Sequence, residues 1–119
     1  MVMTVALTVS AAKPTLDIEP KAHNFGVINE NGGSVTAEFT LTNTGDKPII
    51  IKDAKASCGC TRPSYPKAPI RPGETATLKV AYSPAGRPGE FDKTITIRSN
   101  AKNSKVTVRI TGTVIPEEP

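Results

Sequence analysis

Hydrophobic and polar residues alternate along several short stretches of this chain. In residues 34–43, Val35, Phe39 and Leu41 fall on one side of the alternation, and Thr36 and Glu38 fall on the other. A period of two residues predicts a β-strand that buries one face and exposes the other. No stretch keeps the period of a helix for long enough to predict one. The pattern therefore predicts an all-β protein.

Turn-forming residues separate the alternating stretches. Asn31-Gly32-Gly33 and residues 43–48 have turn compositions, and residues 71–74 place Pro72 and Gly73 at the central positions of a type II turn. Residues 58–69 are punctuated by proline and are interpreted as irregular. About seven short strands with regular turns indicate an antiparallel immunoglobulin-like β-sandwich in one domain, residues 13–115. The expected strands span residues 16–19, 25–28, 34–43, 49–56, 75–82, 91–98 and 106–114.

The apolar side of each alternation predicts the core. Aromatic residues make up only 4% of the chain, so aliphatic side chains must supply most of the buried area. The residues expected to point inward are Val35, Phe39, Leu41, Leu78, Val80, Phe91, Ile95, Ile97, Val108 and Ile110.

The first twelve residues carry no charge and end in Ser10-Ala11-Ala12 before Lys13. Small residues at this spacing fit a signal-peptidase site, so residues 1–12 are interpreted as part of a signal peptide. The alternative is an extra strand, because residues 3–10 also alternate. The stretch is too short to span a bilayer, and no transmembrane segment is predicted. The expected location is the periplasm or the cell surface, and residues 116–119 are a tail.

Charge and composition exclude several function classes. The net charge is +4, but basic and acidic residues are interleaved and no basic run occurs, so no nucleic-acid partner is expected. The sequence has no Ser/His/Asp set, no paired carboxylates on a common face and no phosphate-binding glycine loop. We therefore expect no enzymatic activity, no catalytic residues and no cofactor.

Both cysteines of the chain lie in one short stretch, Cys58-Gly59-Cys60. A disulfide needs Cα atoms within about 4.4–6.8 Å, and fully extended residues two apart lie at or beyond that limit. The loop must therefore contract, and we expect Gly59 to bend it, because glycine can adopt a positive φ at no steric cost. Thr61 and Arg62 follow directly and are the other residues expected to support the loop.

Four interpretations of the cysteine pair remain open. The pair can form a disulfide that rigidifies the loop, or two free thiols that pack as small apolar groups. It can hold a reactive or redox-active thiol, whose thiolate Arg62 would favour. It can also bind a soft metal, for which two thiolates suit Cu(I) better than Zn(II). His23, the lone histidine, is a weak candidate for a third ligand, and no confident metal site is predicted.

Blocks of sequence in a fixed order carry a family resemblance. Asp-Ile-Glu-Pro at 17–20, Asn-Phe-Gly-Val at 24–27 and Ser-Cys-Gly-Cys-Thr at 57–61 resemble a bacterial family of domains of unknown function, number 1573. That family is similar to a wider immunoglobulin-like group that includes the major sperm protein and cilia- and centrosome-associated domains. The resemblance covers about residues 16–114 and implies an exported structural or interaction domain with no settled activity.

The sequence thus predicts a non-enzymatic, exported module that binds an unknown protein partner, with a monomer preferred. Binding would use exposed strand edges or end loops. The alternative is thiol-redox or copper handling through Cys58-Gly59-Cys60.

Overall fold

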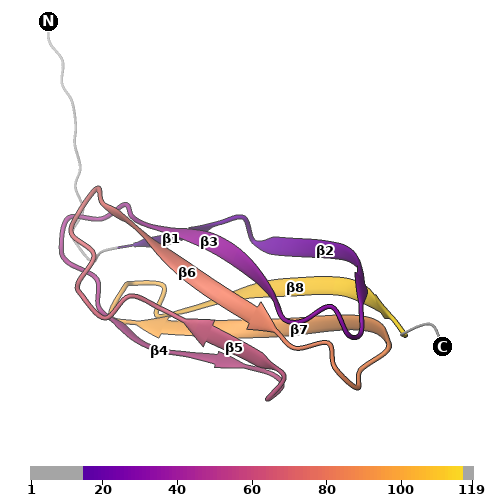
Figure 1. The fold of residues 1–119 in the computed structure, drawn as a ribbon. Coiled ribbons are helices and arrows are strands. Elements are labelled where there is room, and N and C mark those ends of the chain that lie inside the picture. Colours follow the sequence, from indigo (N-terminus) through magenta and orange to yellow (C-terminus); the bar gives the residue numbers. More distant parts are fainter. Residues whose placement is uncertain (1–14, 117–119) are drawn as a thin grey trace, which may run out of the picture.

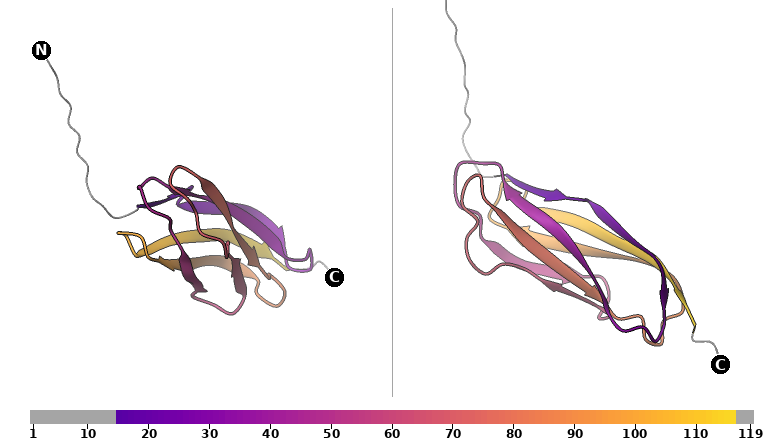
Figure 2. Two further views of the ribbon diagram at one scale, coloured as in Figure 1. Left: turned by 90° about the vertical axis from the view of Figure 1, so that its left-hand side faces the viewer. Right: turned by 45° about the horizontal axis from the view of Figure 1, so that its top comes forward.

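Two four-stranded sheets pack face to face and form the whole of the described structure, a computed structural model that covers residues 15–116 (Figures 1 and 2). The predicted signal-peptide segment, residues 1–12, lies outside the described residues. No helix in residues 15–116 is long and apolar enough to cross a membrane. The strands are β1 (Leu16–Glu19), β2 (Ala22–Asn29), β3 (Val35–Asn43), β4 (Ile51–Ala56), β5 (Thr61–Ser64), β6 (Thr75–Tyr82), β7 (Gly89–Ser99) and β8 (Lys105–Ile115).

The strand order confirms an immunoglobulin-like β-sandwich. One sheet has the order β1-β3-β6-β5 and the other has the order β2-β8-β7-β4. Neighbouring strands run antiparallel, except that β2 runs parallel to β8. The sandwich therefore differs from the predicted antiparallel architecture at one edge.

The chain changes sheet at both open sides of the sandwich. On one side it passes from β1 to β2 through Pro20 and Lys21, and on the other it passes from β4 to β5 through residues 57–60. Each of these four strands is an edge strand of its sheet. The Cys-Gly-Cys stretch is thus the crossover that closes the β4/β5 side.

The described structure has eight strands, one more than the sequence predicts. The additional strand is β5, which lies in the segment interpreted as irregular and contains Pro63. Proline lacks an N–H, which excludes it from central strands but not from an edge. Because β5 pairs only with β6, the sheet accommodates Pro63 opposite Val80.

The inward faces of the two sheets form the core. Nine of the ten predicted core residues are buried, and the tenth, Val35, is half-buried because it begins β3 at the end of the sandwich. The ring of Tyr82 stacks on Phe91 with a centroid distance of 4.0 Å, which joins β6 of one sheet to β7 of the other. The alternation therefore predicted the core correctly.

Two of the predicted turns are present in the structure, one held by side-chain hydrogen bonds and the other identified by its backbone conformation. The fully buried amide of Asn43 donates to the carbonyls of Lys47 and Ile70, at 2.7 and 2.8 Å, and accepts from the N–H of Gly45 at 2.9 Å. Gly73 has a φ of +80°, as the central glycine of a type II turn requires. These turns lie at the end of the sandwich remote from the β2–β3 loop.

Candidate functional site

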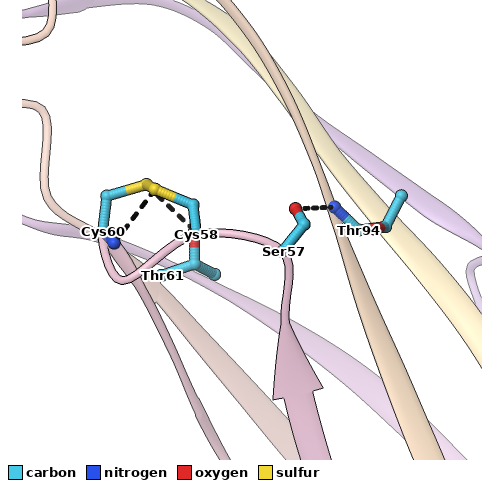
Figure 3. The surroundings of a disulfide bond; sticks show 5 residues. All are labelled: Ser57, Cys58, Cys60, Thr61 and Thr94. Carbon is cyan, nitrogen blue, oxygen red and sulfur yellow. Dashed lines mark hydrogen bonds between the residues drawn. A yellow bond between two sulfur atoms is a disulfide. The ribbon is translucent and has the colours of Figure 1, made fainter.

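The two cysteines form a disulfide within a single tight turn (Figure 3). Their Cα atoms are 5.2 Å apart, and the N–H of Thr61 donates to the carbonyl of Cys58 at 3.1 Å. Gly59 does not adopt a left-handed φ, and a Cβ built on it would meet nothing within 4 Å. The predicted bend at Gly59 and the proximity of the two cysteines are confirmed, and the β-turn achieves both without the positive φ that glycine permits.

The disulfide joins a core position to a more exposed one. Cys60 is 4% exposed and belongs to the core, whereas Cys58 is half-buried. The N–H of Cys60 donates to the Sγ of Cys58 at 3.1 Å, and the Cys60 Sγ lies 3.6 Å from the hydroxyl of Thr61. The Cys58 sulfur is therefore the one nearer to solvent.

Backbone hydrogen bonds attach this turn to both sheets. Ser57 donates its N–H to the carbonyl of Thr94 at 2.9 Å and accepts the Thr94 N–H on its hydroxyl at 3.1 Å. The carbonyl of Cys60 accepts from Ser83, which follows β6, at 3.0 Å. The turn thus fixes the end of β4 to β7, as Figure 3 shows for Ser57 and Thr94, and it fixes the start of β5 to the end of β6.

The structure does not bring the other predicted site residues to the disulfide. His23 lies on β2, at the opposite edge of the sheet from β4, which places it roughly 14 Å away across three strand spacings. Its ring packs against Phe25 with a centroid distance of 4.6 Å. Arg62 is exposed on the face of β5 opposite to buried Thr61. Residues 15–116 contain no group of three metal-ligating side chains, so the weak set of Cys58, Cys60 and His23 is not assembled.

A different feature distinguishes the β2 edge. Exposed strand edges can pair with other chains, and proteins usually protect them with charged residues or proline. Three of the four edge strands carry such residues, whereas β2 carries neither a charge nor a proline. The protecting residues are Asp17 and Glu19 on β1, Lys52, Asp53 and Lys55 on β4, and Arg62 and Pro63 on β5.

The second half of β2 is also apolar on its outer face. A bulge between Asn24 and Val27 contains Gly26, whose φ is +73° and whose N–H donates to the side chain of Asn24 at 2.7 Å. Beyond the bulge, Val27 is 67% exposed and its diagonal neighbour on β8, Ile115, is 43% exposed. Sequence reasoning missed this site, although the absence of charge from residues 22–29 was a readable signal.

An open hollow of about 470 Å³ adjoins the bulge on the same face of the sheet. It is lined by Asn24 on β2, by residues 111–113 on β8 and by residues 90–92 on β7. Asp92 forms an ion pair with Arg109 at 2.9 Å, while Glu90 forms none within residues 15–116. The outer face of this sheet is therefore apolar at Val27 on β2 and acidic at Glu90 on β7, two strands away.

The two sheet orders define an immunoglobulin-like β-sandwich. The solved structure of SSP-19, an MSP-domain protein like family member in Caenorhabditis elegans, is similar to 81% of this chain over 97% of its own length, with 20% identity and a TM-score of 0.55. The chain belongs to the family described as protein of unknown function DUF1573, whose profile matches residues 16–114.

Two bacterial structures share the fold. A protein of unknown function from Porphyromonas gingivalis W83 matches 88% of this chain with 16% identity and a TM-score of 0.75. The Escherichia coli chaperone DraB matches 86% of this chain with 16% identity and a TM-score of 0.57. The chain spans about half of each, 49% and 55% of their lengths. No curated protein sequence matches the chain. At these identities the likeness establishes the fold alone.

Proposed function

We propose that this chain is a non-enzymatic, exported interaction module that binds an extended segment of a partner protein along β2. The observation that carries the proposal is the unprotected edge: among the edge strands in residues 15–116, β2 has no charged residue and no proline. Strand addition uses the backbone groups of such an edge for affinity and its neighbouring side chains for specificity. The fold shared with the chaperone DraB is in keeping with protein binding.

The surroundings of β2 specify the chemistry of the partner. In an added strand, alternate side chains point to opposite faces of the sheet. Those on the outer face would lie beside Val27 and Ile115, and those on the inner face beside half-buried Phe25 and Ile28. We therefore expect an extended segment with apolar residues on both faces near its centre.

Peptide selection tests this function directly. Linear peptides selected on the purified protein are expected to bind with an affinity that Val27→Lys lowers about tenfold or more, because the substitution puts a charge on the edge. Ile50→Lys is the matched control, since Ile50 is also an exposed apolar residue, at 48%, but lies in the loop before β4. Peptides that bind both variants as tightly as the unmodified protein, or a selection without binders, would contradict the proposal.

Export is the second part of the proposal. It is supported by the uncharged N-terminal stretch that ends in Ser10-Ala11-Ala12 and by a disulfide, which persists in oxidising compartments. Intact-mass analysis of the protein from its native host should show an N-terminus near Lys13 in the periplasmic or extracellular fraction. Cytosolic protein that keeps Met1 would refute export.

Thiol or soft-metal handling is the second candidate, and one contact favours it. The N–H of Cys60 points at the Sγ of half-buried Cys58. After reduction of the disulfide, this bond would favour the Cys58 thiolate. The test is a Cu(I) titration of the reduced protein against a chromophoric chelator. A one-to-one complex that the Cys58→Ser/Cys60→Ala variant loses would favour soft-metal handling, and no competition with the chelator would exclude that part of the candidate function.

A further inference from the structure

A basic hollow lies on the outer face of the sheet that contains β2, at the end remote from Val27. Strand β7 ends and β8 begins at that end of the sheet (Figure 1). Its volume is about 210 Å³. Three cationic side chains from three adjacent strands line it, Lys52 of β4, Arg98 of β7 and Lys105 of β8. Ser99 and Ser104 complete the lining.

The strand register forces these cations together. Arg98 and Lys105 are directly opposite each other in the antiparallel β7–β8 pair. Lys52 occupies the irregularity between Ile51 and Asp53 on β4, and such bulges redirect a side chain. Like charges in directly opposite positions destabilise a sheet. Solubility needs charged residues but does not need two cations directly opposite each other, so the pairing of Arg98 with Lys105 suggests a role in binding an anion.

Internal partners neutralise the cluster only in part. Among residues 15–116, Asp53 is the one carboxylate paired with it, and its Oδ1 lies 3.6 Å from the Nε of Arg98, too far for a hydrogen bond. Within residues 15–116, the side chains of Lys52, Arg98 and Lys105 donate no hydrogen bond to protein. The hollow therefore keeps an excess of two formal positive charges and the donors of a guanidinium.

The loop that bears the hollow is fixed in place by two asparagines. Asn103 accepts the N–H of Leu16 at 3.0 Å and donates to the Leu16 carbonyl at 2.7 Å, which ties the β7–β8 loop to β1. Asn100 accepts the N–H of Ile50 at 2.7 Å, which ties the same loop to the chain before β4. A ligand would therefore find Ser104 and Lys105 already positioned.

We propose that this hollow binds a phosphate group, carried by a soluble phosphate ester or by a lipid headgroup of the cell envelope. A tetrahedral oxyanion offers oxygens in several directions, so cations on three neighbouring strands can each contact it. A guanidinium binds such an anion through two parallel hydrogen bonds, and the serine hydroxyl of Ser104 adds a neutral donor. At about 210 Å³ the hollow is many times larger than the space that one water molecule needs, which leaves room for the substituent of the phosphate.

The site is tested by titrating the isotope-labelled protein with inorganic phosphate and recording amide NMR shifts. Chloride added to the same ionic strength is the reference, because a diffuse charge effect would respond to both salts. Saturable shifts at Arg98, Ser104 and Lys105 with phosphate only are expected. Arg98→Lys keeps the charge but removes the paired donors, so it should weaken binding about tenfold or more. Equal responses to phosphate and chloride would overturn the proposal.

Charge-matched variants separate a site from net charge. Lys105→Gln removes a cation from the hollow, whereas Lys79→Gln removes one from β6 in the other sheet. Only Lys105→Gln should abolish the phosphate-specific shifts, and equal losses in both variants would overturn the site. Phosphatidylglycerol vesicles then identify the source. Sedimentation with them that Lys105→Gln prevents assigns an envelope headgroup, and phosphate binding without sedimentation assigns a soluble ester.

Discussion

The ring of Phe91 lies against Gly112, the residue directly opposite it in the β7–β8 pair. A Cβ built on Gly112 would come within 2.8 Å of two ring carbons and 3.1 Å of the carbonyl oxygen of Gly26. The ring has little freedom to move away, because its other face stacks on Tyr82. Gly112 is therefore required for packing in the middle of a strand, and not for backbone conformation.

The first prediction follows from this contact. Gly112→Ala should lower the free energy of unfolding by about 1–3 kcal/mol, as overpacked cores do. Gly59→Ala is the control, because Gly59 has open space around it and no left-handed φ. Urea denaturation measures both. A destabilising Gly59→Ala together with a neutral Gly112→Ala would contradict the claim that packing requires glycine at position 112 and not at position 59.

The second prediction concerns the disulfide. The bridge closes a loop of sequence separation 2, and the chain-entropy model assigns so short a loop about 1.5 kcal/mol. Reductant should therefore lower the free energy of unfolding by about that amount or less, without unfolding the protein. Cys60→Ser should cost more than Cys58→Ser, because only Cys60 lies in the core. Loss of cooperative unfolding in reductant would make the bridge essential to the fold.

The third prediction tests the strand register. Phe39 is fully buried, so Phe39→Ala should lower the free energy of unfolding by about 3–5 kcal/mol. The neighbouring Glu38 is exposed and pairs across the sheet with Lys79, so Glu38→Ala should change it little. A change below about 1 kcal/mol for Phe39→Ala would show that the strand faces are exchanged.

The alternation of residues was enough to predict this core, because one buried face dictates which side chains point inward. The pairing of the strands into sheets was harder to predict from the sequence. Nothing in residues 16–29 shows that the chain changes sheet at Pro20, so neither the parallel β2–β8 pair nor the edge position of β2 follows from the local pattern. Strand β5 was not predicted, because proline at position 63 argues against a strand unless that strand is known to lie at the edge of a sheet.

The fourth prediction concerns alkaline stability. Burial raises the pKa of Tyr82 above its ordinary value of 10.0, and the positive charge of Arg87 opposes that rise. The folded state thus keeps this proton to higher pH than the unfolded chain does, so stability is intact below the ordinary pKa and falls as pH rises above it. Between about pH 8 and about pH 11, Tyr82→Phe should lose less of its unfolding free energy than the unmodified protein.

Tyr65→Phe is the control for this measurement, because Tyr65 is the other tyrosine of the chain and its ring is not in the core. Each variant is compared with its own value at the lower pH, so that any packing change cancels. A Tyr82→Phe variant as sensitive to alkali as the unmodified protein would mean that Tyr82 ionisation does not limit stability.

The candidate site, like the fold, was predictable from the sequence only in part. The proximity of the two cysteines was readable from their spacing, but the separation of His23 from them depends on sheet order, and the basic hollow depends on the β7–β8 register. Contacts between residues close in sequence could be predicted, whereas those set by strand pairing required the fold.

Hydrogen exchange of the β2 amides in complex with a selected peptide tests the central claim most directly. An added strand would bond to the outward backbone groups of β2, so exchange should slow in residues 27–29, beyond the bulge. The β1, β4 and β5 edges, which carry charges or proline, should exchange as they do in the free protein. Slowed exchange at one of those edges, with residues 27–29 unchanged, would contradict the assignment of β2 as the binding edge.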